Sequence, residues 1–264
     1  MWPELSLEAA LLWTARAAAW AAIVDTTELL VLRRNFGPGG IWEPELLAED
    51  WRAFSRPMQV ILHFFLARGF VPLLVLRLGL ALALLGSGYL PLALPLLFGA
   101  VLTSLRFRGS YNGGSDSMMV VLWFGLGLAS IWPDRYGGPA IGLGYIAVQA
   151  GLSYFVAGLV KAKVPGWWSG LELIRATQLP TYDVAAWARR LLGRPVVARV
   201  AALSMLALEL LFPTALLGRP VALVFLLLLG VFHAINAVVF GLNRFFWTWP
   251  ATYPAIYWAA GHLG

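Results

Sequence analysis

Residues 139–161 read PAIGLGYIAVQAGLSYFVAGLVK, and this stretch decides the fold. It contains no charged residue before Lys161, and it is long enough to cross the hydrocarbon core of a bilayer, which takes about 20 helical residues. A soluble protein would have to bury such a helix on all sides. The stretch therefore predicts a membrane-spanning helix.

The composition extends this prediction to the whole chain. Of the 264 residues, 60% are hydrophobic and 12% are charged, and the mean hydropathy is +0.77. Soluble domains carry about 25% charged residues. Cysteine is absent, which excludes disulfide scaffolds, thiolate catalysis and Cys-ligated metals. We therefore expect an all-α integral membrane protein.

Apolar runs interrupted by Gly, Pro and Arg divide the chain into spans. We expect residues 1–264 to form a single transmembrane domain, a polytopic bundle of about eight helices plus interfacial amphipathic helices. The expected helices cover residues 10–32, 70–88, 90–105, 116–132, 139–161, 199–217, 221–241 and 245–260.

Two polar connectors, residues 33–57 and 162–198, are expected to lie at the membrane interface. Indole side chains favour the headgroup level. The connectors contain Trp42, Trp51, Trp167, Trp168 and Trp187. Within the second connector, residues 183–199 have their apolar and arginine side chains on different sides, which predicts an amphipathic helix on the membrane surface.

The basic residues predict an orientation. The net charge is +6, and alternating spans would place most of the 19 Lys and Arg residues on one side, with Arg135 and Arg219 on the other. Cytoplasmic loops of membrane proteins are rich in Lys and Arg, so the basic side is predicted to face the cytoplasm. The charge points to anionic lipid as a partner, and no nucleic acid is expected.

The only two lysines, Lys161 and Lys163, stand at the end of one predicted span. Arginine cannot lose its proton in a protein, so a basic catalyst among these cations would have to be a lysine. Lys161 continues a stripe of small and polar residues at intervals of four, a spacing that suits a helix contact or a cavity. The stripe consists of Gln149, Ser153, Ala157 and Lys161. The structural alternative is a lysine that extends to the headgroups.

A second polar line occurs in VFHAINAVVFGLNRFFWTWP. Spacings of three and four put His233, Asn236, Phe240 and Arg244 on one helical face. An ionisable residue inside a span is costly and is a functional candidate by default. A histidine that hydrogen-bonds a neighbouring helix is the structural alternative. With three histidines and no metal-ligand spacing, we expect no metal site.

The remaining polar residues lie near helix ends. In FRGSYNGGSDSMM, Asn112 and Asp116 are four apart, and the two glycines would let a ligand approach the backbone; a capped turn is the structural alternative. Asp25 and Glu28 are interpreted as structural ion-pair partners of Arg16 or Arg77.

These motifs resemble a known family. YFVAGLVKAKVPGWWSG, from Tyr154 to Gly170, is similar to a segment of vitamin K-dependent gamma-carboxylases and their bacterial HTTM-domain relatives. FHAINAVVFGLNRFFW, from Phe232 to Trp247, resembles the Phe-His-x-x-Asn helix of that family, and YNGGSD resembles its Asn-rich motif less closely. The matches cover much of residues 100–260.

The resemblance implies a site and a cofactor. Lys161 would be the base that deprotonates reduced vitamin K or menaquinone, and His233 would hydrogen-bond the substrate or a quinone oxygen. Candidate quinone contacts are Asn112, Asp116, Gln149, Ser153, Tyr154, Asn236 and Arg244. The partners implied are membrane lipid, the quinone, and a protein or peptide substrate, and the location is a bacterial plasma membrane.

Two departures from the family argue against peptide carboxylation. Gly114 stands where the carboxylases carry a histidine, and the chain ends at Gly264 without their large extramembrane portion. The leading hypothesis is a membrane enzyme with a lysine base, acting in carboxylation or related oxygen-dependent chemistry. The alternative is a non-catalytic component that binds lipid or holds a partner. A transporter ranks third because no inverted repeat is visible.

Overall fold

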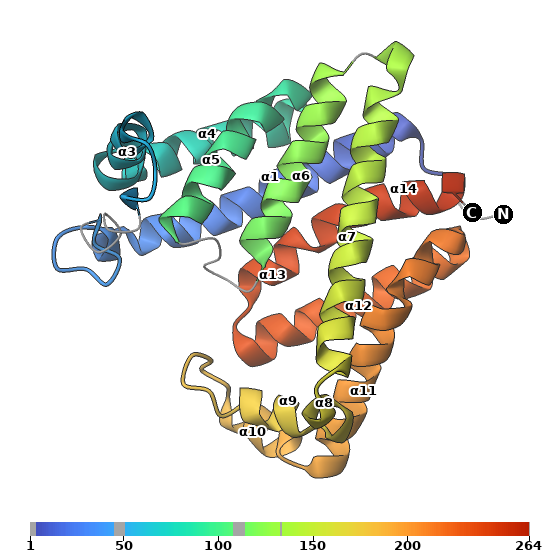
Figure 1. Cartoon of the computed structure of the whole chain (residues 1–264). Coiled ribbons are helices and arrows are strands. Elements are labelled where there is room, and N and C mark those ends of the chain that lie inside the picture. Colours follow the sequence, from blue (N-terminus) through green and yellow to red (C-terminus); the bar gives the residue numbers. More distant parts are fainter. Residues whose placement is uncertain (1–3, 45–50, 108–113, 133, 264) are drawn as a thin grey trace.

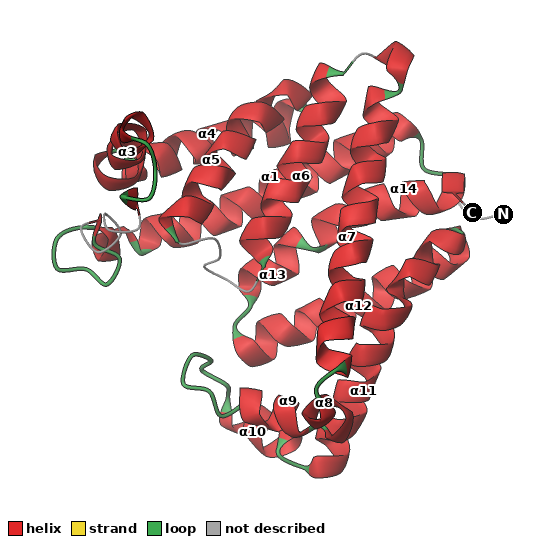
Figure 2. Ribbon diagram, viewed as in Figure 1, coloured by secondary structure: helices red, strands yellow, loops and turns green. Residues whose placement is uncertain are grey.

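The computed structural model describes residues 4–44, 51–107, 114–132 and 134–263. These residues form helices and connecting loops, and none of them forms a strand, as Figure 2 shows. The predicted all-α class is confirmed. The long helices are α1 (Leu7–Val31), α4 (Phe70–Ser87), α5 (Ala93–Arg106), α6 (Ser115–Ile131), α7 (Gly138–Ala162), α11 (Pro195–Leu211) and α12 (Arg219–Phe240).

Shorter helices connect these elements. The elements labelled η are short turns of other helix types: η2 is π-helical, and η1 and η3 to η6 are 3-10 helical. The short elements are η1 (Arg33–Phe36), α3 (Arg56–Leu62), η2 (His63–Arg68), η3 (Leu90–Leu92), η4 (Asp134–Tyr136), α8 (Pro165–Ser169), α9 (Leu171–Ala176), α10 (Ala186–Leu192), η5 (Phe212–Leu217), α13 (Asn243–Thr248), η6 (Pro250–Thr252) and α14 (Tyr253–Leu263).

Helices α7 and α1 make contacts with several other long or C-terminal helices. Helix α7 packs against α6, α11 and α14, while α1 packs against α4, α13 and α14 (Figure 1). The first helix is rich in buried alanines, which let neighbouring backbones approach closely, and small residues serve this purpose at helix contacts in membranes.

Glycines produce a close helix contact between α6 and α7. A Cβ on Gly125 would lie 2.5 Å from the Ile146 Cγ1 atom, and a Cβ on Gly142 would lie 2.8 Å from the Ala129 Cβ atom. Real side chains do not approach so closely, so the crossing requires glycine at both positions.

Within the described ranges, five helices are long and apolar enough to cross a membrane, namely α1, α4, α7, α12 and the continuous segment Pro195–Leu217. Leu90–Arg106 and Ser115–Ile131 are shorter apolar helices. Helix α12 exposes a stripe of aliphatic side chains that suits contact with lipid. The stripe consists of Val224, Leu227, Leu228, Val231, Ile235 and Val238. The chain is an integral membrane protein.

Two predicted elements were wrong in length. The expected helix 245–260 is divided into α13, η6 and α14, because Pro250 lacks the N–H that a continuous helix needs. The expected amphipathic helix 183–199 is reduced to Ala186–Leu192, and the next helix begins at Pro195. The proline again sets the boundary, since proline is favoured in the first turn of a helix.

Candidate functional site

A cavity of about 1360 Å³ lies between α6, α7, α11, α12 and α13. The connector after α9 adds Thr181 and Tyr182 to its wall. Most lining side chains are apolar or aromatic, with a few polar groups among them, which is the usual character of a small-molecule site. Helices α6 and α7, which correspond to the fourth and fifth predicted spans, both contribute to this wall.

Helix α7 contributes the predicted stripe to this cavity. Gln149, Ser153, Ala157 and Lys161 all line it, as does Tyr154. A spacing of four residues keeps these positions on nearly one face of the helix, and that face is turned away from lipid. The structure therefore brings the α7 candidates together.

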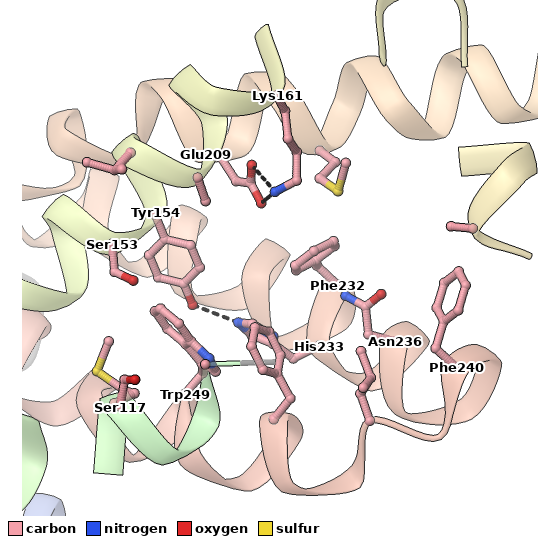
Figure 3. Close-up of a pocket in the computed structure, with 18 of the residues that line it drawn as sticks. Ser117, Ser153, Tyr154, Lys161, Glu209, Phe232, His233, Asn236, Phe240 and Trp249 are labelled. Atoms are coloured by element: carbon pink, nitrogen blue, oxygen red, sulfur yellow. Dashed lines mark hydrogen bonds and ion pairs between the residues drawn. The ribbon is translucent and has the colours of Figure 1, made fainter. Parts of the chain in front are cut away.

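Lys161 forms an ion pair with Glu209 at the edge of the cavity (Figure 3). The Nζ atom donates to both carboxylate oxygens, at 2.6 and 2.7 Å. The Lys161 side chain is 23% exposed and the Glu209 side chain is 6% exposed. The ammonium also lies 5.8 Å from the centre of the Trp167 ring, within range of a cation–π interaction.

Glu209 is a site residue that the sequence analysis missed. It stands in the run ARVAALSMLALELLF, where it is the only acid. A lone carboxylate in an apolar span is costly, so it signals a buried partner or a functional role. The sequence contains this lone acid, but it does not show which helix carries the partner of the carboxylate.

Gly158 makes the approach of α11 to α7 possible. A Cβ at this position would lie 3.0 Å from the Glu209 Cβ atom and 3.0 Å from the Leu210 backbone nitrogen. The absence of a side chain lets the carboxylate reach the amine one turn further along α7.

His233 forms the second polar pair in the cavity. Its Nε2 atom lies 2.7 Å from the Tyr154 hydroxyl, and the side chain is completely buried. The indole of Trp249 stacks on the imidazole, with ring centres 5.7 Å apart, and Phe245 lies against it at 4.9 Å. The Nδ1 atom of His233 has no hydrogen-bond partner among the described residues. Figure 3 shows both polar pairs beside one cavity.

Three of the four residues in the predicted polar line of the later helix reach the cavity. Asn236 and Phe240 line it together with His233. Arg244 is not among the lining residues, so its assignment as a quinone contact finds no support in this cavity. Gly241, in the left-handed conformation at φ 70°, caps the end of α12, so Arg244 lies in a separate helix, α13, and its side chain is directed away from the cavity wall.

Arg244 belongs instead to a buried ion-pair network between α1, α4 and α13. It pairs with Asp25 and with Glu28, in each case at 2.7 Å, and Arg77 pairs with Asp25 at 2.5 Å. The interpretation of Asp25 as a partner of Arg77 is confirmed. The interpretation of Arg16 as a partner is not, because the pairing cation of Glu28 is Arg244.

The Gly-rich loop gives a mixed result. Asn112 lies outside the described residues, so its assignment stays a prediction. Asp116 is buried in the first turn of α6 and is not part of the cavity wall, whereas Gly114 and Ser117 are. Gly114 adopts φ 92°, a conformation that favours glycine.

The described residues contain no group of three or more His, Asp or Glu side chains placed to hold a metal ion. Four of the polar groups on the cavity wall form two pairs, Lys161–Glu209 and Tyr154–His233, among aromatic side chains. This arrangement suits a flat organic molecule with polar oxygens.

A comparison with protein families matches the segment that supplies most of the residues around this cavity. Residues 138–259 match the model of the HTTM domain, a range that runs from the start of α7 into α14 and includes Lys161, Glu209 and His233. Neither the curated proteins nor the solved structures gave a significant match. The match confirms the resemblance to HTTM-domain proteins for residues 138–259 of this integral membrane protein.

Proposed function

We propose that this protein is a membrane-embedded enzyme that takes a proton from a reduced quinone or a similarly acidic, lipid-soluble molecule. The observation that carries the proposal is the cavity into which the Lys161–Glu209 and Tyr154–His233 pairs both open. A proton acceptor and a hydrogen-bonding pair at one apolar cavity are what such a reaction requires.

The side chains around the cavity fit a quinone. Trp249, Phe245 and Tyr154 offer flat aromatic surfaces, and ring stacking favours a flat ligand. His233 Nδ1 and Trp249 Nε1 are buried and lack partners among the described residues. A buried polar atom without a partner costs about 1–3 kcal/mol, which a ligand oxygen would recover.

When bound, a reduced quinone would supply an acidic hydroxyl and a source of electrons for reaction with oxygen. Tyr154 and His233 would hold a ligand oxygen, and Gln149 and Ser153 would add polar contacts from α7. Lys161 would stand beside the hydroxyl that loses its proton. The resemblance extends the proposal to carboxylation or related oxygen-dependent chemistry, with any modified peptide supplied by a separate protein.

The first test is direct. Mass spectrometry of lipid extracted from the purified protein should find a bound quinone, and addition of a reduced naphthoquinone should start oxygen uptake. A preparation that yields only bulk phospholipid and consumes no oxygen would contradict the proposal.

The second test addresses Lys161 with a matched control. Lys161→Arg keeps the positive charge and removes the exchangeable proton, so we expect a loss of about 10²-fold or more in oxygen uptake. Lys163→Arg makes the same change two residues away at an exposed position and should have no effect. Full activity in both variants would refute a role for Lys161 in proton transfer.

A second candidate function is a non-catalytic membrane component that binds lipid or holds a partner. The observation in its favour is the Lys161–Glu209 ion pair itself, because it joins α7 to α11 and would stabilise a scaffold. This candidate predicts that Lys161→Arg retains the ion pair and every property of the protein.

A further inference from the structure

The bidentate ion pair changes which group can receive a proton. With Nζ bound to both oxygens of Glu209, the charged forms of the two side chains stabilise each other. An ammonium ion has no lone pair, so Lys161 in this state cannot act as a base. In the same state the Glu209 carboxylate can.

We infer that the proton acceptor of this site is the Lys161–Glu209 pair acting as one unit, and that the added proton comes to rest on Glu209. The inference rests on the proposed function and makes it more specific. Lys161 relays the proton: it passes one of its own protons to Glu209 and takes the substrate proton in its place. It ends the step as an ammonium ion beside the substrate anion, which it stabilises.

The balance of the step is simple. An O–H bond of the substrate hydroxyl breaks and an O–H bond forms on the Glu209 carboxyl group, with no oxidant or reductant involved. The pair changes from net neutral to a charge of plus one while the substrate changes from neutral to minus one. A route through neutral lysine and protonated Glu209 leads to the same final state, so the end point does not depend on the order of transfers.

The charges around the cavity support this assignment. Of the described residues that line it, Lys161 is the single Lys or Arg and Glu209 the single Asp or Glu. His233 is completely buried and bonded to Tyr154, so a substrate anion would find its positive partner in Lys161. If Lys161 were the sole base, Glu209 would be left as an unprotonated carboxylate facing the new anion.

The packing around Glu209 also supports Glu209 as the group on which the added proton comes to rest. Glu209 is almost fully buried in a span, and the glycine at position 158 is what lets its backbone come close to α7. A lysine at a helix end can reach water without a partner, so an acid placed at this depth does more than anchor the amine.

The decisive variant is Glu209→Gln. Glutamine keeps the size and one acceptor oxygen but cannot take up the proton. A lone lysine base predicts unchanged or faster proton uptake, since the loss of the carboxylate favours the neutral amine. The paired acceptor predicts a loss of about 10²-fold in oxygen uptake driven by a reduced naphthoquinone.

Infrared difference spectroscopy gives a readout that is independent of turnover. Anaerobic binding of a reduced naphthoquinone to the ¹³C-glutamate-labelled protein should produce a carboxylic acid band from Glu209. The band should be missing in Glu209→Gln and present in Glu172→Gln. Glu172 is the matched control, because it also pairs with a cation, Arg175 at 2.7 Å, but lies outside the cavity wall.

If Glu209→Gln does not fold, a variant with a shorter acidic side chain serves as the second test. Glu209→Asp keeps an ionisable group and should show the acid band with reduced oxygen uptake. A wild-type protein that binds the naphthoquinol without any carboxylic acid band would overturn the inference and leave the proposed function intact, as would a fully active Glu209→Gln variant. A wild-type protein that binds no naphthoquinol would overturn the proposed function itself.

Discussion

The crossing of α6 and α7 gives a prediction that can be worked from distances. In Gly142→Ala the new methyl group would lie 2.8 Å from the Ala129 Cβ atom and 3.1 Å from the Ala129 backbone nitrogen, and it would also collide with the Gly125 carbonyl oxygen. Carbon atoms pack best at about 3.5–4.0 Å. The neighbours are helix backbone and a Cβ atom, so the two helices must move apart.

The matched control is Gly144→Ala on the same helix. A Cβ at Gly144 would meet no atom within 4 Å. Both substitutions gain the same helix propensity, up to about 1 kcal/mol, so their difference isolates the collision. Overpacking costs about 1–3 kcal/mol, and at about 2–4 °C per kcal/mol the melting temperature of Gly142→Ala should be about 2–12 °C below that of Gly144→Ala.

The assay is thermal unfolding of the detergent-solubilised protein followed by tryptophan fluorescence. Because α7 also carries Lys161, the displaced helix should weaken quinone retention in Gly142→Ala and not in Gly144→Ala. Equal melting temperatures for the two variants would show that α6 and α7 do not cross as closely as described. They would refute the claim that this contact requires glycine at position 142.

Two further predictions concern buried polar groups. Arg244→Gln should reduce the free energy of unfolding by about 1–3 kcal/mol, because it removes one of the two cations paired with buried Asp25 and the cation paired with half-buried Glu28. Exposed Arg190→Gln should change the free energy of unfolding by less than about 0.5 kcal/mol. Denaturant titration measures both variants, and similar values would refute the network's role. Tyr154→Phe should reduce the free energy of unfolding by about 1–3 kcal/mol, because it removes the hydrogen-bond partner of His233. Tyr136→Phe, at an exposed position, should leave the free energy of unfolding unchanged. Identical melting curves for the two variants would exclude a stabilising hydrogen bond between Tyr154 and His233.

The helices were largely predictable because hydropathy and length are local properties. The span expected at 139–161 is observed as Gly138–Ala162, and the span expected at 70–88 is observed as Phe70–Ser87. The sequence analysis went wrong where a single residue overrides an apolar pattern. Pro250 divides the last helix in this way, and Pro195 ends the predicted amphipathic segment early.

The candidate site was predictable along each helix and not between helices. The four-residue spacing correctly placed Ser153 and Lys161 on one face of α7. The partners of Lys161 and His233 come from other helices, and their identity depends on how those helices cross, which a repeat in one segment does not encode. Glu209 was missed for this reason, and Arg244 was misplaced because the turn at Gly241 interrupts the spacing.

The ion pairs of Arg244 bear on where the chain can be cut. The segment matched by the HTTM model begins at residue 138, yet both carboxylates that neutralise this guanidinium belong to the first helix, more than a hundred positions earlier. A fragment that starts at Gly138 would lack both of these carboxylates and leave a buried, permanently charged guanidinium without them, at a cost in stability. Expression trials, truncation libraries and chimaeras should therefore retain the amino-terminal helix, although it lies before the matched range.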